Sequence, residues 1–383
     1  MRILFVSECY PNQDKPQYGI FIKQQEQALR ELGHEVEVLV PALTAKDGQV
    51  ETCENGIYNL QYRTARYNLF PVWASPKACK SIHHLIEEKH YDLVAVHITG
   101  DGILKMVVTA CNRLNTAVVV HYHGLNIWEE FKTAHPYRQK LYAAYRKSIL
   151  QKVQGVVGVS DKVSSIARER LHGIPVATVY NGVDLSLFAY KARSADEFKI
   201  IGVGNLIEIK GFTYLLKAFA RLHRQLPHTR LEIIGDGVLK DSLQEETVVL
   251  GVADAVTFAG KVPYEQVAKK MAQSDLFVLP SFYEALGCVY LEAMGCGVPT
   301  IGVRGMGIDE IIVHGENGML VNPKDVQDLY DKMHQVATDT ALAGRLGENG
   351  AETAQKYTWD ASAKTLNTFY EACIRNEFSV LNG

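Results

Sequence analysis

Residues 280–294 read PSFYEALGCVYLEAM, and the patterns in and just before them indicate the fold class. The short apolar run before it, residues 275–279, has the pattern of a buried strand, and residues 289–294 have that of a helix start. A tight loop that holds Gly287 joins the two. A strand, a tight loop and a helix leave free backbone N–H groups at the edge of a sheet, and such an edge binds anions. The stretch therefore predicts an anion site in an α/β domain.

The length and composition of the chain predict a two-domain globular protein. A chain of 383 residues is too long for one ordinary hydrophobic core. With 47% hydrophobic residues, 22% charged residues and a net charge of -3, nothing in the composition calls for nucleic acid as a partner. Residues 1–185 hold 21 Lys+Arg against 18 Asp+Glu, a balance of +3, whereas the remainder holds 19 against 25. This mildly basic N-terminal half is a hint of an anionic partner.

The cysteines and the apolar runs indicate the compartment. Seven scattered cysteines form no CxxC pair and no Cys/His cluster with metal-ligand spacing, which is typical of reduced cytosolic thiols. The opening residues MRILFVS are too short for a signal peptide and lack a cleavage site. No apolar run approaches the ~20 residues that span a bilayer. We therefore expect a cytoplasmic protein that is soluble or peripheral to a membrane.

Short apolar runs alternate with longer helical patterns along the whole chain. The runs are continuous rather than alternating, which marks strands that are buried on both faces of a parallel sheet. They lie at residues 3–7, 36–40, 58–62, 93–97, 117–121, 155–159, 177–180, 199–203, 230–234, 256–259, 276–279, 300–303 and 319–321. The helical patterns between them make the chain α/β, with two Rossmann-like units in tandem.

The boundary between the units and the end of the chain can also be predicted. A charged stretch with few apolar residues, 190–197, follows the turn-forming residues 181–184, which places the boundary near residue 185. Residues 361–373 have the pattern of a helix, and Asp360 is a plausible N-cap. A helix packed on the surface of its own domain is one alternative for that segment.

A lysine lies where a strand of the second unit turns into a helix. Residues 203–211 read VGNLIEIKG, and the helix that follows is predicted over 212–226. Lys210 can reach a diphosphate at the carboxyl edge of the sheet, where a departing nucleoside diphosphate gathers negative charge. An exposed loop lysine without a ligand is the alternative.

Two glutamates flank the predicted helix start, with seven residues between them. Glu284 lies in the loop and Glu292 in the helix. Their carboxylates suit sugar hydroxyls, which donate hydrogen bonds, better than phosphates, which repel them. The alternative reading is a helix N-terminal Glu that offsets the helix dipole and a solvated helix Glu.

The first unit has two candidate ligand positions. Gly19 precedes a helix that ends near residues 33–34, and a glycine lets the backbone approach a ligand. His123 follows the strand at 117–121, and the carboxyl end of a parallel strand faces the ligand crevice. His121 alternates with Tyr122 along the strand, so a structural role is expected for it. An ordinary turn and a capping or core histidine are the alternatives for Gly19 and His123.

The string from residue 281 to 299, with Glu284 and Glu292 in place, resembles the E-x7-E signature of the retaining glycosyltransferases of family GT4, which have the GT-B fold. The resemblance covers the chain from Met1 to about Tyr370. It implies two Rossmann-like domains that face each other across a cleft. Residues 1–185 would bind the acceptor, residues 186–355 the nucleotide-sugar, and residues 356–383 would form a C-terminal helix that crosses back to the first domain.

The resemblance also implies roles for individual residues. His123, Glu284 and Lys210 would carry the chemistry, with His123 on the donor sugar, Glu284 beside that sugar and its pyrophosphate, and Lys210 on the diphosphate. The remaining donor-binding residues would be Gly19, Asn205, Ala285, Leu286, Gly287 and Glu292, with Glu292 on the ribose. Asn205 stands where the family's G-R-L-x-x-x-K-G segment has Arg. Arg304, in a turn like the family's G-G-x-P-E, is a candidate replacement for that charge.

The implied reaction is transfer of a sugar from a UDP- or GDP-sugar to a sugar or lipid-linked acceptor, with retention of anomeric configuration. The donor's own phosphate would help deprotonate the acceptor, and neither a cofactor nor a metal is expected. Synthesis of a cell-surface polysaccharide or glycolipid is the expected context. Two rival classes remain open: a GT-B-related nucleotide-sugar epimerase and a non-catalytic module that binds nucleotide-sugars. Only the transferase would form a glycosidic bond to an added acceptor.

A basic segment in the first unit suggests a membrane-borne acceptor. Residues 132–152 contain no acidic residue. The cations are Lys132, Arg138, Lys140, Arg146, Lys147 and Lys152, interleaved with Tyr137, Leu141, Tyr142, Tyr145, Ile149 and Leu150. Such a helix can lie on an anionic membrane surface, here the inner face of the plasma membrane. The alternative is a helix whose apolar face packs on its own sheet.

Overall fold

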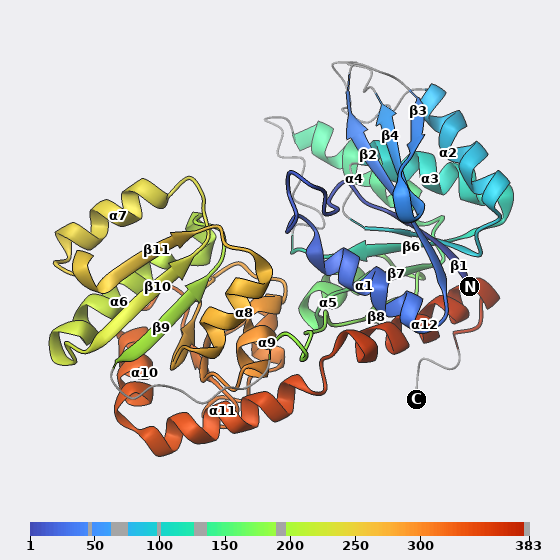
Figure 1. Cartoon of the computed structure of the whole chain (residues 1–383). Helices are drawn as coiled ribbons and strands as arrows, with labels where there is room; N and C mark the ends of the chain where they lie inside the picture. Colours follow the sequence, from blue (N-terminus) through green and yellow to red (C-terminus); the bar gives the residue numbers. More distant parts are fainter. Residues whose placement is uncertain (45–47, 63–75, 98–100, 126–135, 189–196, 379–383) are drawn as a thin grey trace. The chain divides into compact units, whose positions relative to one another are not determined.

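The computed structural model describes residues 1–44, 48–62, 76–97, 101–125, 136–188 and 197–378. The chain forms two compact units, Met1–Tyr180 together with Asp360–Gly383, and Asn181–Trp359 (Figure 1). The boundaries predicted after residues 185 and 355 fall within a few residues of these. Lys132 and nearly all of the charged stretch 190–197 lie outside the described residues.

The first unit is built on an eight-stranded sheet with the order β3-β4-β2-β1-β5-β6-β7-β8. All neighbouring pairs are parallel except β3 and β4. The strands are β1 (Arg2–Val6), β2 (Glu35–Leu43), β3 (Gln49–Thr52), β4 (Ile57–Tyr62), β5 (Leu93–Val96), β6 (Ala117–Tyr122), β7 (Gly155–Gly158) and β8 (Val176–Thr178). Strands β1, β5, β6 and β7 are buried along almost their whole length, as expected for parallel strands covered on both faces.

The helices of the first unit connect these strands. They are α1 (Ile20–Glu31), α2 (Pro76–Lys89), α3 (Asp101–Leu114), α4 (Pro136–Leu150) and α5 (Asp161–Arg170), and α12 (Trp359–Arg375) joins them from the end of the chain. Helices α2, α3 and α4 pack against one another in that order (Figure 1).

Strand β3 is the one strand of the described residues that the sequence does not predict. It is antiparallel to β4, lies at the edge of the sheet and is mostly exposed. Its sequence, QVET, has a single apolar residue, so the apolar run that reveals the buried strands is missing. All the other strands appear where the sequence predicts them.

Helix α12 crosses back to the first unit, as the resemblance implied. From Asp360 onward it belongs to that unit, and its buried side chains Leu366, Phe369 and Tyr370 recur at helical spacing. Asp360 is not the N-cap: the helix begins one residue earlier, and the Asp360 carboxylate lies 2.7 Å from Lys364 Nζ within the first turn. The surface helix on its own domain is therefore the wrong alternative.

The second unit contains a six-stranded parallel sheet with the order β11-β10-β9-β12-β13-β14. The strands are β9 (Phe198–Val203), β10 (Thr229–Ile234), β11 (Val256–Gly260), β12 (Leu276–Val278), β13 (Thr300–Val303) and β14 (Met319–Val321). The helices are α6 (Phe212–Gln225), α7 (Lys240–Val249), α8 (Tyr264–Ala272), α9 (Cys288–Gly295), α10 (Val326–Thr338) and α11 (Thr340–Ala354).

Each sheet has a topological switch point, where the strand order reverses direction along the chain. In the first sheet it lies between β1 and β5, and in the second between β9 and β12. Ligands of open α/β sheets bind outside the carboxyl ends of the strands at such a point. The two loops that follow β9 and β12, and those that follow β1 and β5, are therefore where a ligand site is expected.

Candidate functional site

The loops after β9 and β12 are held against each other at the switch point of the second sheet. Phe282 N–H donates to the Ile209 carbonyl at 3.0 Å, and Ser281 Oγ donates to the same oxygen at 3.1 Å. Gly211 has a φ of 74°, and a Cβ at that position would lie 2.2 Å from the Pro280 carbonyl oxygen. Only glycine combines this left-handed backbone with so close an approach. The packing of these two loops therefore requires a glycine at position 211, next to the charged residue Lys210.

Lys210 and Glu284 form an ion pair across these two loops. Lys210 lies in the 3-10 turn Glu208–Lys210, and its Nζ donates to Glu284 Oε2. The two side chains are only 18% and 13% exposed. Charges that are largely withdrawn from water need such a partner. The structure therefore brings together the two residues that the sequence predicts for this part of the site, and Glu284 holds the lysine in place.

The loop before α9 offers backbone donors next to this pair. Gly287 is the N-cap of α9 with a φ of 81°, and the first turn of the helix has no acidic residue. Among the described residues, no acceptor is found for the amides of Leu286 and Gly287. The N-terminus of a helix attracts an anion through its free amides and its dipole. The two free amides and the N-terminus of α9 therefore lie together at the position where the sequence predicts an anion site.

Glu292 is a buried carboxyl group one turn into α9. It is 8% exposed, and Tyr264 Oη donates to its Oε1 at 2.7 Å. Burial raises the pKa of Glu292 to about 7, and the hydrogen bond from Tyr264 lowers it by less. A carboxylate with so little solvent gains from further hydrogen-bond donors such as hydroxyl groups. The sequence did not predict that Tyr264 contacts Glu292, because nothing in it indicates that α8 packs against α9.

Asn205 and Arg304 both lie in loops that follow strands of the second sheet. Asn205 is exposed after β9, and Arg304 is exposed after β13. Burial lowers the pKa of His314, and the charge of Arg304 lowers it further. No contact in the described part of the chain joins Arg304 to Asn205. The sequence also missed Lys324, whose Nζ lies over the Phe282 ring at 4.2 Å from the centroid.

In the first unit, the start of α1 lies beside the end of β6. Gly19 is the N-cap of α1 with a φ of 75°, and a Cβ there would lie 2.3 Å from the Cys9 carbonyl oxygen. Two residues further, the Phe21 ring lies 4.9 Å from that of His123, measured between centroids. Phe21 of α1 therefore brings the helix that Gly19 begins next to the candidate histidine.

The requirement for glycine at position 19 can be tested by comparison with Gly33. Both have a positive φ, but a Cβ at Gly33 would meet no atom within 4 Å. Gly33→Ala therefore carries the backbone strain alone. We expect Gly19→Ala to lower the free energy of unfolding by about 1–3 kcal/mol more, because of the added clash. Urea unfolding of the two variants measures the difference, and equal losses would show that the Cys9 contact imposes no constraint.

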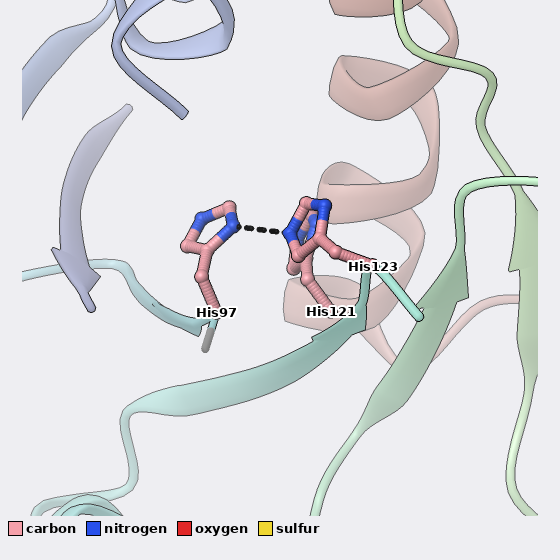
Figure 2. Close-up of side chains that lie close together, drawn as sticks. All are labelled: His97, His121 and His123. Carbon is pink, nitrogen blue, oxygen red and sulfur yellow. Dashed lines mark hydrogen bonds between the residues drawn. The ribbon is translucent and has the colours of Figure 1, made fainter. Parts of the chain in front are cut away.

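A third histidine, which the sequence did not single out, joins His123. His97 follows β5, and its Nδ1 lies 3.0 Å from His123 Nε2 (Figure 2). The His121 ring is packed 4.3 Å from that of His97, and His121 Nε2 lies 2.7 Å from Tyr370 Oη on α12. Contact with α12 gives His121 the structural position expected of it. The sequence could have revealed His97 only through its place at the end of the adjacent strand.

These three histidines are the one group of possible metal ligands in the part of the chain that the structure describes. Their candidate ligand atoms lie within 4.8 Å of one another. Zinc with bonds of about 2.0–2.1 Å holds its nitrogens about 3.3 Å apart. The His97 and His123 rings are nearly parallel, at 22°, and their facing nitrogens already share a hydrogen bond. The geometry is that of a hydrogen-bonded pair with a third ring packed beside it, and it would have to rearrange around an ion.

The basic segment of the first unit is only partly a surface feature. Arg146, predicted to face a membrane, is instead buried, and its Nε lies 3.4 Å from Asp101 Oδ1. The apolar side chains Tyr142, Ile149 and Leu150 are buried as well. Tyr137, Lys140, Leu141 and Lys147 are exposed on α4, and Lys152 is exposed just after the helix. In the described residues, no helix is long and apolar enough to cross a bilayer.

Several known proteins are similar to this chain in sequence or in structure. The lipopolysaccharide core biosynthesis glycosyltransferase LpsE of Rhizobium meliloti is 32% identical over 51% of this chain and 56% of its own length. The N-acetyl-alpha-D-glucosaminyl L-malate synthase of Bacillus anthracis is 26% identical over 98% of this chain and 99% of its own. The solved structure of Anabaena HepE in complex with UDP has a TM-score of 0.75 at 19% identity, covering 97% of this chain and 100% of that one.

Two family descriptions match nearly the whole chain. Glycosyltransferase Family 4 matches residues 19–187, and Glycosyl transferases group 1 matches residues 187–353. The two matched regions correspond to the two units of the structure, each with its Rossmann-like parallel sheet. The chain belongs to the GT4 glycosyltransferases, and its fold is GT-B.

Proposed function

We propose that this glycosyltransferase transfers a sugar from a UDP- or GDP-sugar to an acceptor hydroxyl with retention of anomeric configuration. The observation that carries the proposal is the set of groups at the β9/β12 switch point: the Lys210–Glu284 pair, the free amides of Leu286 and Gly287, and buried Glu292. These groups match a diphosphate flanked by a ribose and a sugar. The cation and the amides suit the diphosphate, and the carboxylates suit the hydroxyls of the ribose and the sugar.

The diphosphate would bind between Lys210 and the N-terminus of α9. The leaving nucleoside diphosphate gains negative charge as the glycosidic bond breaks, and positive groups held in place beforehand stabilise that charge best. Lys210 is held by Glu284, so little reorganisation is needed when the donor binds. No metal is required in this scheme, because the lysine and the amides neutralise the charge.

The ribose and sugar hydroxyls would donate hydrogen bonds to the carboxylates, and His123 would form a hydrogen bond with the transferred sugar. None of these groups has to act as a nucleophile. The donor's own phosphate oxygen takes the proton of the acceptor hydroxyl on the same face from which the leaving group departs, which retains the configuration. Catalysis then consists of positioning and charge stabilisation.

The named relatives support the donor class and the biological context. HepE has been solved with UDP and with UDP-glucose, at TM-scores of 0.75 and 0.71. The rhizobial relative is named for lipopolysaccharide core biosynthesis. We therefore propose a nucleotide-sugar donor and a sugar or lipid-linked acceptor in the synthesis of a cell-surface polysaccharide or glycolipid.

A lipid-linked acceptor would be reached most easily by an enzyme on the membrane surface. We expect the exposed face of α4 to bind anionic vesicles at low salt, since each Lys or Arg near such a surface contributes about 1 kcal/mol. The double change Lys140→Gln/Lys147→Gln should weaken co-sedimentation with these vesicles. The matched control is Lys261→Gln/Lys269→Gln, on exposed lysines of the second unit. If folded wild-type protein does not bind anionic vesicles at low salt, a soluble acceptor is the better proposal.

The proposed activity is tested in two steps. Thermal unfolding with a panel of nucleoside diphosphates and nucleotide-sugars identifies the donor, because a ligand that binds only the native state raises the midpoint. The stabilising nucleotide-sugar is then incubated with candidate acceptors, and the products are analysed by mass spectrometry. A glycosylated acceptor is the expected result. Isomerised donor without transfer would indicate an epimerase, and binding without any reaction a non-catalytic module.

A further inference from the structure

We propose that Tyr264 is a positioning residue for the donor nucleotide, because its hydroxyl holds Oε1 of Glu292 and thereby directs Oε2 to the ribose. The hydrogen bond is a property of this chain alone. Its consequence for the nucleotide rests on the function proposed above, in which Glu292 binds the ribose hydroxyls. Tyr264 has no other part in the proposed transfer.

The packing of two helices brings the two side chains together. Helices α8 and α9 lie against each other, with Tyr264 as the first residue of α8 and Glu292 one turn into α9. Tyr264 Oη lies 2.7 Å from Glu292 Oε1. The ionised carboxylate, which is the form that would bind hydroxyl groups, can only accept hydrogen bonds. In that form the tyrosine hydroxyl is therefore the donor.

The ring of Tyr264 is itself held in place. It is packed edge-on against Phe188, with 5.2 Å between the ring centroids and 65° between the planes. Phe188 is fully buried, and its N–H donates to the Asp184 carbonyl at 2.9 Å. A Cβ at Gly295 of α9 would lie 3.0 Å from the Phe188 carbonyl oxygen, so this segment also packs against α9. The hydroxyl of Tyr264 can therefore act as a fixed anchor for a carboxylate.

The two oxygens of Glu292 have different surroundings. Tyr264 occupies Oε1, whereas no donor to Oε2 is found among the described residues. Oε2 is not one of the fully buried side-chain atoms without a partner, so it keeps contact with solvent. One carboxylate oxygen has lone pairs for two neighbouring hydroxyls. Without Tyr264 the carboxyl group could take a broad range of orientations about its last torsion, and Oε2 would no longer be directed to the ligand.

The same hydrogen bond favours the ionised form of Glu292. Burial raises the pKa of Glu292 to about 7, and the bond from Tyr264 opposes that rise. Strand β13 and helices α8 and α11 pack against α9. Among the titratable groups that these elements and α9 carry in the described residues, those that interact with Glu292 are Tyr264 and the thiol of Cys288. Burial raises the pKa of that thiol to about 12, so it stays uncharged in the neutral range.

The hydrogen bond is tested first without a ligand. Tyr264→Phe removes the hydroxyl and keeps the ring that packs on Phe188. Carbon NMR of the full-length protein, labelled at its glutamate carboxyl groups, follows the titration of Glu292, whose signal is assigned by its loss in Glu292→Gln. We expect Tyr264→Phe to raise the midpoint by about one pH unit, as the loss of one hydrogen bond to a charged group should. An unchanged midpoint would overturn the proposal.

Tyr330→Phe is the matched control. Tyr330 lies on α10 of the same unit, and its Oη donates to Gln225 Oε1 on α6 at 2.8 Å. This variant also removes one tyrosine hydroxyl with its hydrogen bond, but the bond does not reach α9. The midpoint of Glu292 and the nucleotide affinity should stay at their wild-type values. A shift as large as that of Tyr264→Phe would show a general effect rather than a contact with Glu292.

Calorimetry with UDP and GDP measures the consequence for the nucleotide. At pH 7 about half of Glu292 would be ionised in the wild type and about a tenth in Tyr264→Phe, so the affinity should fall about fivefold. At pH 9 Glu292 is ionised in most molecules of both proteins. A smaller loss should remain there, because the carboxylate is no longer oriented. Equal affinities at pH 9 would contradict the positioning role.

A double-mutant cycle shows whether Tyr264 acts through Glu292. In the Glu292→Ala background, Tyr264→Phe should change nucleotide affinity by less than about twofold, because no carboxylate is left to position. Equal losses in both backgrounds would overturn the proposal. The proposed function fails in a different way: if Glu292→Ala binds the nucleotide as tightly as wild type, Glu292 does not hold the ribose. The titration without ligand still decides whether Tyr264 holds Glu292.

Discussion

Lys210→Ala is expected to reduce turnover by one to three orders of magnitude, which corresponds to about 1.4–4 kcal/mol of transition-state stabilisation. Lys210 lies in the loop after β9 at the β9/β12 switch point, and its Nζ is already directed to Glu284 in the loop that would hold the donor. The leaving diphosphate carries more charge in the transition state than in the bound donor. Removal of the cation should therefore lower kcat rather than only raise KM. Steady-state kinetics with the identified donor measure both.

A matched variant separates the site from a general loss of lysine charge. Lys217 lies on α6, is 48% exposed, and its Nζ is 3.7 Å from Glu246 Oε1. Lys217→Ala removes a Lys–Glu pair from the same unit at the surface, where such pairs contribute little. We expect its turnover to stay near that of wild type. If folded Lys210→Ala also turns over normally, Lys210 does not bind the diphosphate, and Arg304 or Lys324 becomes the candidate.

Glu292→Ala is expected to weaken binding of the free nucleoside diphosphate by roughly 2–4 kcal/mol, the loss of two hydrogen bonds from ribose hydroxyls to a charged acceptor. The fold should survive, because burial disfavours the ionised carboxylate in the first place. Calorimetry with UDP and GDP measures the loss. A variant that binds the nucleotide as tightly as wild type would show that Glu292 does not hold the ribose.

Glu284→Ala is the matched control for this experiment. Glu284 lies in the same loop as Leu286 and Gly287 and would lie by the transferred sugar, which the free nucleoside diphosphate lacks. This variant should therefore lose transfer while binding the free nucleotide almost as well as wild type. Equal losses of nucleotide affinity in both variants would mean that the two carboxylates do not have separate ligands.

The raised pKa of Glu292 adds a pH dependence to the same binding. Only the ionised carboxylate accepts hydrogen bonds from two hydroxyls, and the pKa is raised to about 7 by burial. Affinity for the nucleotide should therefore rise as the pH increases through about 7 and level off above it, with a change of up to tenfold per pH unit below. Glu292→Gln removes the titrating carboxyl group, whereas the phosphates of the nucleotide titrate as before. The difference between the two profiles isolates the contribution of Glu292.

The sequence predicted the buried strands well, because parallel strands covered on both faces are continuous apolar runs. Strand β12 is the clearest case: Leu276, Phe277 and Val278 are all fully buried. The prediction failed where burial is absent, as at the polar edge strand β3. It also placed the start of the last helix too late, since Trp359 and Asp360 carry no signal that separates a cap from a first turn.

The candidate site was predicted in part for a different reason. Lys210, Glu284 and Gly287 follow strands that are neighbours of the switch point, and the sequence order of strand ends and loops is enough to bring them together. Tyr264 and His97 were missed because each acts through a side-chain contact, to Glu292 at 2.7 Å and to His123 at 3.0 Å. Such contacts depend on how elements pack, and a single sequence does not contain that information.

The structure of the protein bound to the nucleoside diphosphate that stabilises it most is the direct test of the central claim. We predict the diphosphate at Lys210 and at the amides of Leu286 and Gly287, with both ribose hydroxyls on Glu292. A nucleotide bound elsewhere, for instance in the groove between α2 and α3 lined by Lys80, Lys105 and Arg113, would contradict the account.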